Sequence, residues 1–204
     1  MKLLAQSTLI ICITCQLVTL SIFGQNGSEN SEDFPINTLK TEANVDINYV
    51  DLIDRISNSE SSVTQFILIR HAEKSEGEPD PELSDVGIER ARRLAVILSE
   101  LEIDRVYSTQ FNRTVQTATP IANDQGIEIS YYSGFDQVEV VKDILDHVCG
   151  GTVVIVGHSN TIPQFINVLT GTTDYEHIES DDYDNLFVVS TRSLGESEVI
   201  HLKY

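Results

Sequence analysis

Two histidines and two arginines lie where short apolar runs of the chain end. Arg70 and His71 directly follow the first of these runs, His158 comes just after the fourth, and Arg113 lies a few residues beyond the second. A neutral imidazole is a nucleophile, and the planar fork of a guanidinium group matches the oxygens of a phosphate. A lone histidine after a strand is more often a loop or capping residue. Arginine is rarely buried without an anionic partner, however, so the four side chains together indicate an anion site.

Apolar runs alternate with amphipathic segments along the chain from residue 63. We expect strands at 66–69, 103–107, 127–131 and 152–156, helices at 84–101, 112–123, 137–148 and 162–170, and a final hairpin of 186–190 and 198–202. This alternation predicts an α/β fold, a three-layer α/β/α sandwich with a mainly parallel sheet. Ligands of such sheets bind at the carboxyl ends of the strands, so the four candidate side chains should meet at one edge of the sheet.

The helix expected at 84–101 has a clear amphipathic pattern. We expect Arg90, Arg92 and Arg93 on its solvated face, and the following positions on its buried face: Ile88, Ala91, Leu94, Ala95, Leu98 and Leu101.

Four segments resemble, in order, the motifs of the histidine phosphatase superfamily, whose fold is called phosphoglycerate-mutase-like. They resemble its Arg-His-Gly-Glu, Leu-Thr/Ser-x-x-Gly, Ser-x-x-x-Arg-x-x-x-Thr-Ala and Gly-His-x-x motifs, and they begin at Arg70, Leu83, Ser108 and Gly157. Ala72 stands where the first motif usually has glycine. The resemblance covers roughly Phe66–Phe187 and is greatest to the small, SixA-type phosphohistidine phosphatases.

The resemblance implies a role for each candidate residue. His71 is the nucleophile that becomes phosphohistidine, Arg70 and Arg113 hold the phosphoryl oxygens, and His158 donates to the phosphoryl group. The arginines should also help to keep His71 deprotonated, because a further positive charge is unfavourable beside them. A backbone carbonyl is expected to hold the second ring nitrogen of His71 as a donor. No metal and no cofactor are expected.

A general acid that protonates the leaving oxygen is harder to assign. Larger relatives use a carboxylate after the third strand, which makes Asp136 the first candidate and Glu139 the second. Either residue also fits an ordinary position at the start of the helix 137–148. Small members of the superfamily often lack an obvious acid.

These residues predict a metal-independent phosphatase that hydrolyses a phosphomonoester or a phosphoramidate through His71. Two alternatives remain open: a pseudo-enzyme that binds a phosphorylated ligand without turnover, and a phosphoglycerate-mutase-like mutase. The expected partner is a phosphorylated small molecule or a phosphoprotein. Substrate choice is expected to lie in the loops 75–81, 132–137 and 172–184. The acidic run 181–184 is expected to be a solvated part of the last loop.

The charge and the N-terminal sequence indicate where the protein acts. The 204-residue chain has a formal net charge of −19, which argues against nucleic acid as a partner. Residues 1–25 resemble a signal peptide, 26–62 a polar linker or arm with a short helix at 48–57, and 63–204 the enzyme domain. We expect export to the periplasm or secretion, with no stable membrane span after cleavage, or a membrane anchor if the segment is retained.

Overall fold

The computed structural model describes residues 39–41, 46–47, 49–77 and 79–204. The predicted signal peptide at 1–25 and much of the predicted arm therefore lie outside the described residues. Within the described part of the chain, no helix has both the length and the apolar character needed to cross a membrane.

The chain alternates strands and helices, as its apolar pattern predicts. The strands are β1 (Leu39–Thr41), β2 (Asp46–Ile47), β3 (Thr64–Arg70), β4 (Arg105–Ser108), β5 (Ile129–Tyr131), β6 (Thr152–Gly157), β7 (Asn185–Ser193) and β8 (Glu196–Lys203). The helices are α1 (Tyr49–Ser57), α2 (Asp85–Leu98), α3 (Asn112–Gln125), α4 (Gln137–His147) and α5 (Thr161–Thr170). Each strand and helix expected from residue 63 onwards is present, with bounds that differ by a few residues.

The strands form one sheet in the order β2-β1-β8-β7-β3-β6-β4-β5. The strands β3, β6, β4 and β5 are parallel to one another, whereas β7 pairs antiparallel with β3 and with β8. The six strands from β3 to β8 are thus mostly parallel, which confirms the predicted fold class. The pairing of β3 with β6 places the carboxyl ends of these two strands side by side.

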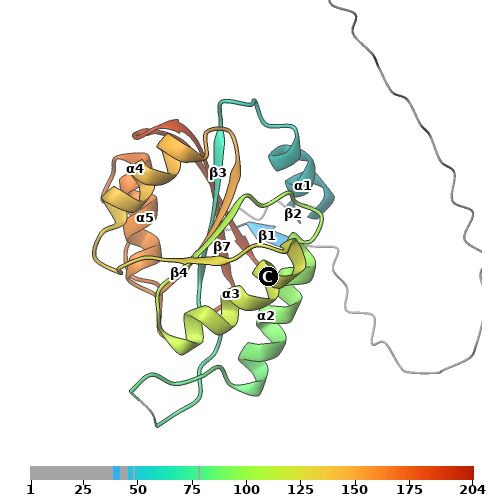
Figure 1. Ribbon diagram of the computed structural model, residues 1–204, viewed down its shortest axis with the longest axis vertical. Coiled ribbons are helices and arrows are strands. Elements are labelled where there is room, and N and C mark those ends of the chain that lie inside the picture. The colour runs from blue at the N-terminus through green and yellow to red at the C-terminus, as the bar shows by residue number, and fades with distance from the viewer. Residues whose placement is uncertain (1–38, 42–45, 48, 78) are drawn as a thin grey trace, which may run out of the picture. The chain divides into compact units, whose positions relative to one another are not determined.

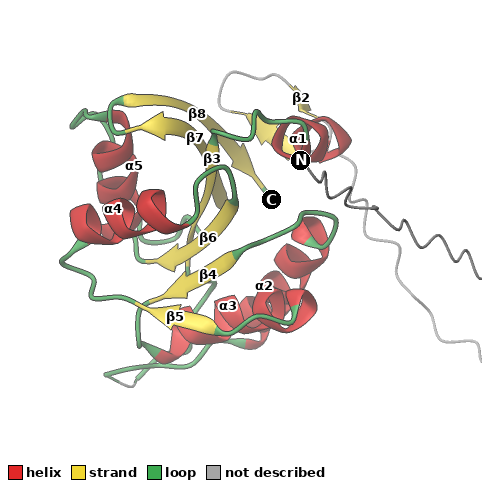
Figure 2. Cartoon of the chain, turned by 45° about the horizontal axis from the view of Figure 1, so that its top comes forward, coloured by secondary structure: helices red, strands yellow, loops and turns green. Residues whose placement is uncertain are grey.

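Helices cover both faces of the sheet, as Figures 1 and 2 show. Alternate side chains of each central strand point to opposite faces, so that Ile67 and Ile69 join one apolar cluster and Phe66 and Leu68 the other. The first cluster includes buried side chains of α1, α2 and α3, and the second includes those of α4 and α5. The sandwich therefore has two cores, one on each side of the sheet.

Helix α1 lies in the segment predicted to be an arm. Its Leu52 and Ile56 are buried in the same cluster as α2 and α3, and Ile53 packs against that cluster. The strands β1 and β2 extend the sheet beyond β8, with β1 antiparallel to β8.

The buried face of α2 differs from the predicted one at two positions. Ile88 is 37% exposed and Gly87 is buried in its place, because α2 approaches the backbone of Glu73 so closely that a β-carbon at Gly87 would collide with it. Arg90, predicted to be solvated, has a side chain that is only 18% exposed.

Candidate active site

The register of β3 and β6 brings the two histidines together. Arg70 pairs with Gly157 across these strands, and the backbone N–H of His71 donates to the Gly157 carbonyl oxygen at 2.9 Å. The ring centroids of His71 and His158 are 5.5 Å apart, with an edge-to-face angle of 67°. Neighbouring parallel strands thus hold both rings at the carboxyl edge of the sheet, where ligands of such folds bind.

His71 is held as a neutral imidazole. Its Nδ1 lies 2.8 Å from the Ala72 carbonyl oxygen, so Nδ1–H donates there and Nε2 carries the free lone pair. The pKa of His71 is lowered to about 3, chiefly by burial, with smaller contributions from the charges of Arg70, His158 and Arg113 that act against the hydrogen bond to Ala72. The sequence indicated the arginine effect, but burial is the larger cause. The imidazole is therefore unprotonated at neutral pH.

Arg70 is a buried guanidinium with donors to spare. Nη1 donates to the carbonyl oxygens of Glu179 at 2.7 Å and Asp182 at 3.0 Å, and Nη2 donates to that of Ser180 at 2.9 Å. Three of the five N–H donors of the group are thus used. The buried Nε has no hydrogen-bond partner within the described part of the chain. The charge of this guanidinium lies close enough to His71 to lower the pKa of that imidazole.

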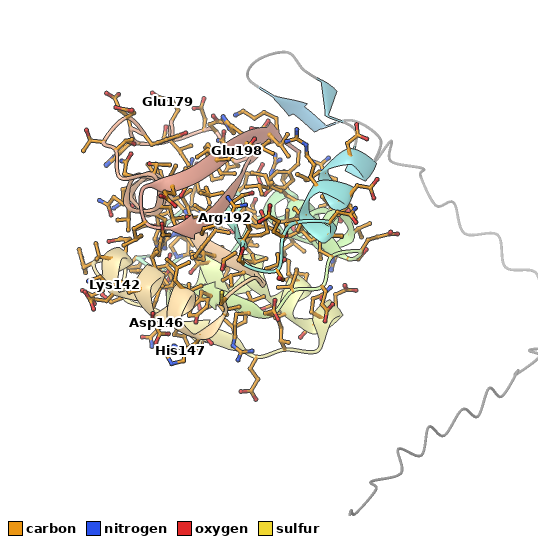
Figure 3. The ribbon with its side chains drawn as sticks, turned by 90° about the horizontal axis from the view of Figure 1, so that it is seen from above. Lys142, Asp146, His147, Glu179, Arg192 and Glu198 are labelled. Carbon is orange, nitrogen blue, oxygen red and sulfur yellow. The ribbon has the colours of Figure 1, made fainter. Side chains whose placement is uncertain are left out.

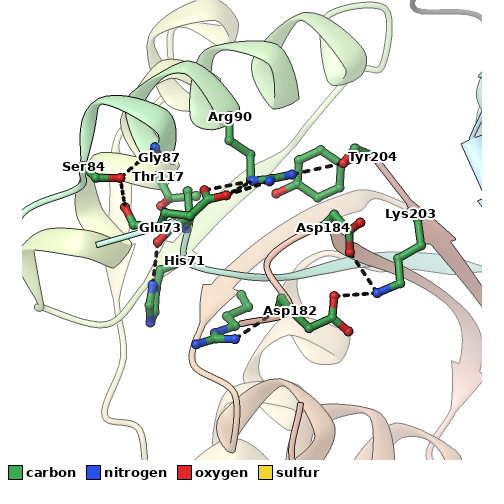
Figure 4. A network of polar contacts seen from close by, with 12 residues as sticks. His71, Glu73, Ser84, Gly87, Arg90, Thr117, Asp182, Asp184, Lys203 and Tyr204 are labelled. Atoms are coloured by element: carbon green, nitrogen blue, oxygen red, sulfur yellow. Dashed lines mark hydrogen bonds and ion pairs between the residues drawn. The ribbon is translucent and has the colours of Figure 1, made fainter. Parts of the chain in front are cut away.

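The loop 179–184, which binds Arg70, is itself held by ion pairs with Lys203. The Lys203 Nζ lies 2.6 Å from Asp182 Oδ1 and 2.8 Å from Asp184 Oδ1, as Figure 4 shows. The Arg70 guanidinium also lies over the Tyr183 ring, 4.1 Å from its centroid. The prediction that the acidic run 181–184 is merely solvated is therefore wrong, because the backbone and the ring of this run fix Arg70.

Arg113 begins the first turn of α3 and faces the same site. Its Nη1 lies 3.4 Å from Asp80 Oδ1, and its Nη2 lies 3.5 Å from His158 Nδ1. The backbone N–H of Asn112 also donates to the Asp80 carboxylate, at 3.0 Å. Asp80 therefore orients Arg113 from the loop 75–81.

His158 is fixed at both ring nitrogens. Its Nε2 lies 2.9 Å from the Thr109 hydroxyl, while Nδ1 faces Arg113. Burial lowers the pKa of His158 to about 4, and Arg113 and Arg70 add to the effect. Because a guanidinium nitrogen can only donate, Nδ1 is the acceptor in the contact with Arg113, and the Nε2–H then donates to the Thr109 hydroxyl. Donation from Nδ1 to a phosphoryl oxygen requires that the contact with Arg113 breaks and that the Thr109 hydroxyl donates to Nε2.

The remaining motif residues position the loop that follows His71. Ser84 caps α2 by accepting from the Gly87 N–H at 3.2 Å, and its own N–H donates to the Glu73 carbonyl oxygen at 2.9 Å. The Thr117 hydroxyl accepts from the Ala72 N–H at 3.0 Å. Figure 4 shows these contacts around His71. The motif residues thus act on the nucleophile through the backbone of residues 72–73.

Glu73 and Arg90 form a partly buried ion pair next to this loop. Arg90 Nε lies 2.9 Å from both carboxylate oxygens of Glu73, and Arg90 Nη1 donates to the Tyr204 carbonyl oxygen at 3.1 Å. Burial raises the pKa of Glu73, but the hydrogen bonds from Arg90 outweigh it and the net pKa lies below its usual value. The pair connects α2, the loop after His71 and the end of β8.

Replacing Arg90 with methionine should therefore destabilise the protein. The change leaves the Glu73 carboxylate without its partner, which should cost about 1–3 kcal/mol in the free energy of unfolding. The matched control is Arg92→Met on the same helix, because Arg92 pairs with Glu89 at a solvated position and the change should cost less than about 0.5 kcal/mol. Urea unfolding of both variants measures the difference, and equal losses would contradict the assigned role of Arg90.

The structure does not bring the predicted acids into this set of contacts. Asp136 precedes α4 with an exposed side chain that makes no capping hydrogen bond. The Glu139 carboxylate is 75% exposed and pairs with Lys142 on the outer surface of α4, where Figure 3 shows Lys142. The carboxylate that touches the site is Asp80, which was not predicted as a site residue and lies in the loop 75–81 that was expected to influence substrate choice.

The described residues contain no cluster of three or more histidine, cysteine or acidic side chains that could hold a metal ion. The chemistry that these residues can supply is nucleophilic attack by an imidazole on an anion held by guanidinium groups.

An α/β sandwich with two histidines and two arginines at the carboxyl edge of its sheet has the groups needed to bind a phosphoryl anion. Residues 66–140 match the model of the histidine phosphatase superfamily (branch 1). This segment, about a third of the chain, is similar to that superfamily. His158 lies beyond the matched segment and is connected to it by the pairing of β6 with β3 and β4.

A sequence relative and several solved structures are similar to this chain. Phosphoserine phosphatase 1 of Hydrogenobacter thermophilus is 36% identical over 74 residues, which are 33% of this chain and 35% of that protein. The match thus spans about a third of the relative's length.

The similar structures share the fold at low sequence identity. A mycobacterial glucosyl-3-phosphoglycerate phosphatase has a TM-score of 0.58 at 13% identity, covering 67% of this chain and 97% of the other. Phosphoserine phosphatase of Entamoeba histolytica has a TM-score of 0.57 at 20% identity, covering 69% and 97%. A structure described as the phosphohistidine phosphatase SixA of Nakamurella multipartitia has a TM-score of 0.56 at 18% identity, covering 72% and 98%.

Proposed function

We propose that the protein is a phosphatase that hydrolyses a phosphomonoester or a phosphoramidate through a phosphohistidine on His71. The observation that carries the proposal is a neutral, buried His71 whose Nδ1 is held by the Ala72 carbonyl oxygen, leaving Nε2 free, with the charges of Arg70 and Arg113 close enough to lower its pKa. Arg113 and His158 complete the group of side chains around this point. The phosphatases named among the relatives support the same reaction class.

The first half-reaction moves the phosphoryl group to the protein. The Nε2 lone pair forms a bond to phosphorus, the bond between phosphorus and the leaving oxygen breaks, and that oxygen keeps the electron pair and takes a proton from solvent water. For a phosphoramidate the bond that breaks is between phosphorus and nitrogen. Arg70 and Arg113 offset the charge on the phosphoryl oxygens, and most of the catalytic effect comes from this electrostatic stabilisation and from positioning.

The second half-reaction restores His71. A water oxygen attacks phosphorus, the bond between phosphorus and Nε2 breaks, and the electron pair returns to the imidazole. The products are inorganic phosphate and the dephosphorylated substrate. None of these steps requires a metal ion, because guanidinium groups stabilise the transferred charge.

The covalent intermediate can be trapped directly. Rapid quenching in base during turnover of phenyl phosphate, with EDTA present, should yield a base-stable, acid-labile phosphoryl group that mass spectrometry locates on His71. A phosphorylated carboxylate or serine, or turnover without any modified His71, would contradict the proposal. Tight phosphate binding without hydrolysis would instead favour the non-catalytic alternative.

A further inference from the structure

A cavity beside the phosphoryl site has the composition of a leaving-group pocket. It encloses about 540 Å³, which is within the usual size range of small-molecule sites. The described residues that line it are Asp80, Thr109, Gln110, Phe111, Tyr131, Tyr132, Ser133 and Gly134. The cavity shares its wall with the site, because Thr109 binds His158 and Asp80 binds Arg113.

The aromatic residues of this pocket are held in place by the site and by the core. The Phe111 ring meets the His158 ring edge to face at 5.2 Å, and the Arg113 guanidinium lies 4.6 Å from the Phe111 centroid. The Tyr132 hydroxyl donates to the Val156 carbonyl oxygen, and its ring packs on Phe165. Tyr131 is 54% exposed at the same cavity. Such rings form flat apolar walls that favour an aromatic ligand.

The charge of the pocket limits what a substrate can carry at its far end. Among the described residues that line the cavity, Asp80 is the one charged side chain, and the chain as a whole has a net charge of −19. A second anionic group on the substrate would find no cation among these lining residues, because the neighbouring Arg113 is already paired with Asp80, and the Asp80 carboxylate would repel it. A neutral or cationic group would not be penalised in this way.

The proton supply points to the same kind of leaving group. Both oxygens of Asp80 accept hydrogen bonds from the Asn112 N–H, and Arg113 also donates to Oδ1, so this carboxylate is engaged as an acceptor. Asp136 is exposed at the start of α4. An aryl oxide is a far weaker base than an alkoxide, with a pKa of about 10 for a phenol such as tyrosine, and it leaves with little help from an acid.

We infer that the pocket selects aryl phosphomonoesters whose ring carries a neutral or cationic substituent, and that it disfavours esters with a second anionic group. This inference rests on the proposed phosphatase activity and assigns its substrate class. It separates this chain from substrates such as phosphoserine, which carries a carboxylate and an alkyl leaving oxygen and is named for two of the relatives.

Two matched substrates test the charge preference. O-Phosphotyramine and 4-(carboxymethyl)phenyl phosphate both release a phenol and differ in the sign of the charge opposite the phosphate. We expect kcat/KM for phosphotyramine to exceed that of the carboxymethyl ester by about tenfold at low ionic strength, and phosphoserine to be poorer than either. A ratio near one, or a reversed ratio, would overturn the inference.

Variants of the pocket show whether the lining residues cause the preference. Asp80→Asn should reduce the ratio of kcat/KM for phosphotyramine to kcat/KM for the carboxymethyl ester to about two or below. This holds even if both kcat/KM values fall, because the change removes the charge that distinguishes the two substrates. Tyr131→Ser should lower kcat/KM for both aryl esters, whereas the control Phe135→Ser should not, because the fully solvated Phe135 lies outside the lining. If the kcat/KM ratio is unchanged in Asp80→Asn, the charge preference does not depend on Asp80 and the inference is wrong.

The same experiment separates failure of the inference from failure of the proposed function. If the wild-type protein hydrolyses phosphoserine or phenyl phosphate in a His71-dependent way but neither substituted aryl ester, the phosphatase stands and the inference is wrong. If it hydrolyses none of the four compounds and forms no phosphohistidine, the proposed function itself fails.

Discussion

Replacing His71 with alanine should lower the turnover of phenyl phosphate by about four orders of magnitude or more, while the protein stays folded. The change removes the one atom that can form the covalent intermediate, and loss of an activated nucleophile typically has an effect of this size. The side chain is buried but short, and its main polar contact is to the Ala72 carbonyl oxygen. Its loss should therefore cost only about 1–2 kcal/mol of folding free energy.

The control for this variant is another histidine that lies far from the chemistry. His147 is on the solvated surface of α4, where Figure 3 shows it beside Asp146, and its ring pairs with Asp143. His147→Ala should keep wild-type kinetics. Calorimetry should show that His71→Ala still binds inorganic phosphate, since Arg70 and Arg113 remain. Normal turnover in His71→Ala would refute the nucleophile assignment.

The strands and helices were predictable because a strand that is buried on both faces of a sheet has a continuous run of apolar residues in the sequence. The continuous apolar runs in β3 and β6 are fully buried, and the polar residues directly after them fall at the carboxyl edge of the sheet. Placing Arg70, His71 and His158 near one another required only this rule and a parallel register. These are the residues that the structure brings together.

The partners of these residues were not predictable, because their contacts depend on backbone groups and loop paths. Arg70 binds carbonyl oxygens of Glu179, Ser180 and Asp182, and a carbonyl oxygen has the same chemistry at every position in a sequence. Asp80 contacts Arg113 from a position 33 residues earlier in the chain. No periodic pattern specifies such a contact.

The surface of α2 shows how a local close contact overrides periodicity. Helical spacing alone placed Ile88 on the buried face and Arg90 in solvent. In the structure, Gly87 is buried because it packs closely against the backbone of Glu73. The Glu73 carboxylate forms an ion pair with Arg90, which removes Arg90 from solvent. The glycine of this motif thus explains both departures, because any larger residue would push α2 away from the loop that follows His71.

Replacing Arg70 with lysine should lower kcat for phenyl phosphate by about 10²- to 10³-fold, although the charge is conserved. Lysine has no fork of donors, so it cannot hold the three carbonyl oxygens of the 179–182 loop and also present an Nε–H to a phosphoryl oxygen. The variant should bind inorganic phosphate more weakly in calorimetry. It should also unfold more easily, by about 1–3 kcal/mol, because buried carbonyl oxygens lose donors.

The matched control is Arg192→Lys. Arg192 lies on β7, far from the site, where it forms a solvated ion pair with Glu60; Figure 3 shows Arg192. It should keep both kcat and stability. Rates of all variants are compared well below the unfolding transition, so that loss of folded protein does not mimic loss of catalysis. If Arg70→Lys loses stability but keeps kcat within about twofold, the guanidinium serves only to hold the 179–182 loop. A large fall in kcat with weakened phosphate binding identifies the Arg70 guanidinium as a donor to the transferred group.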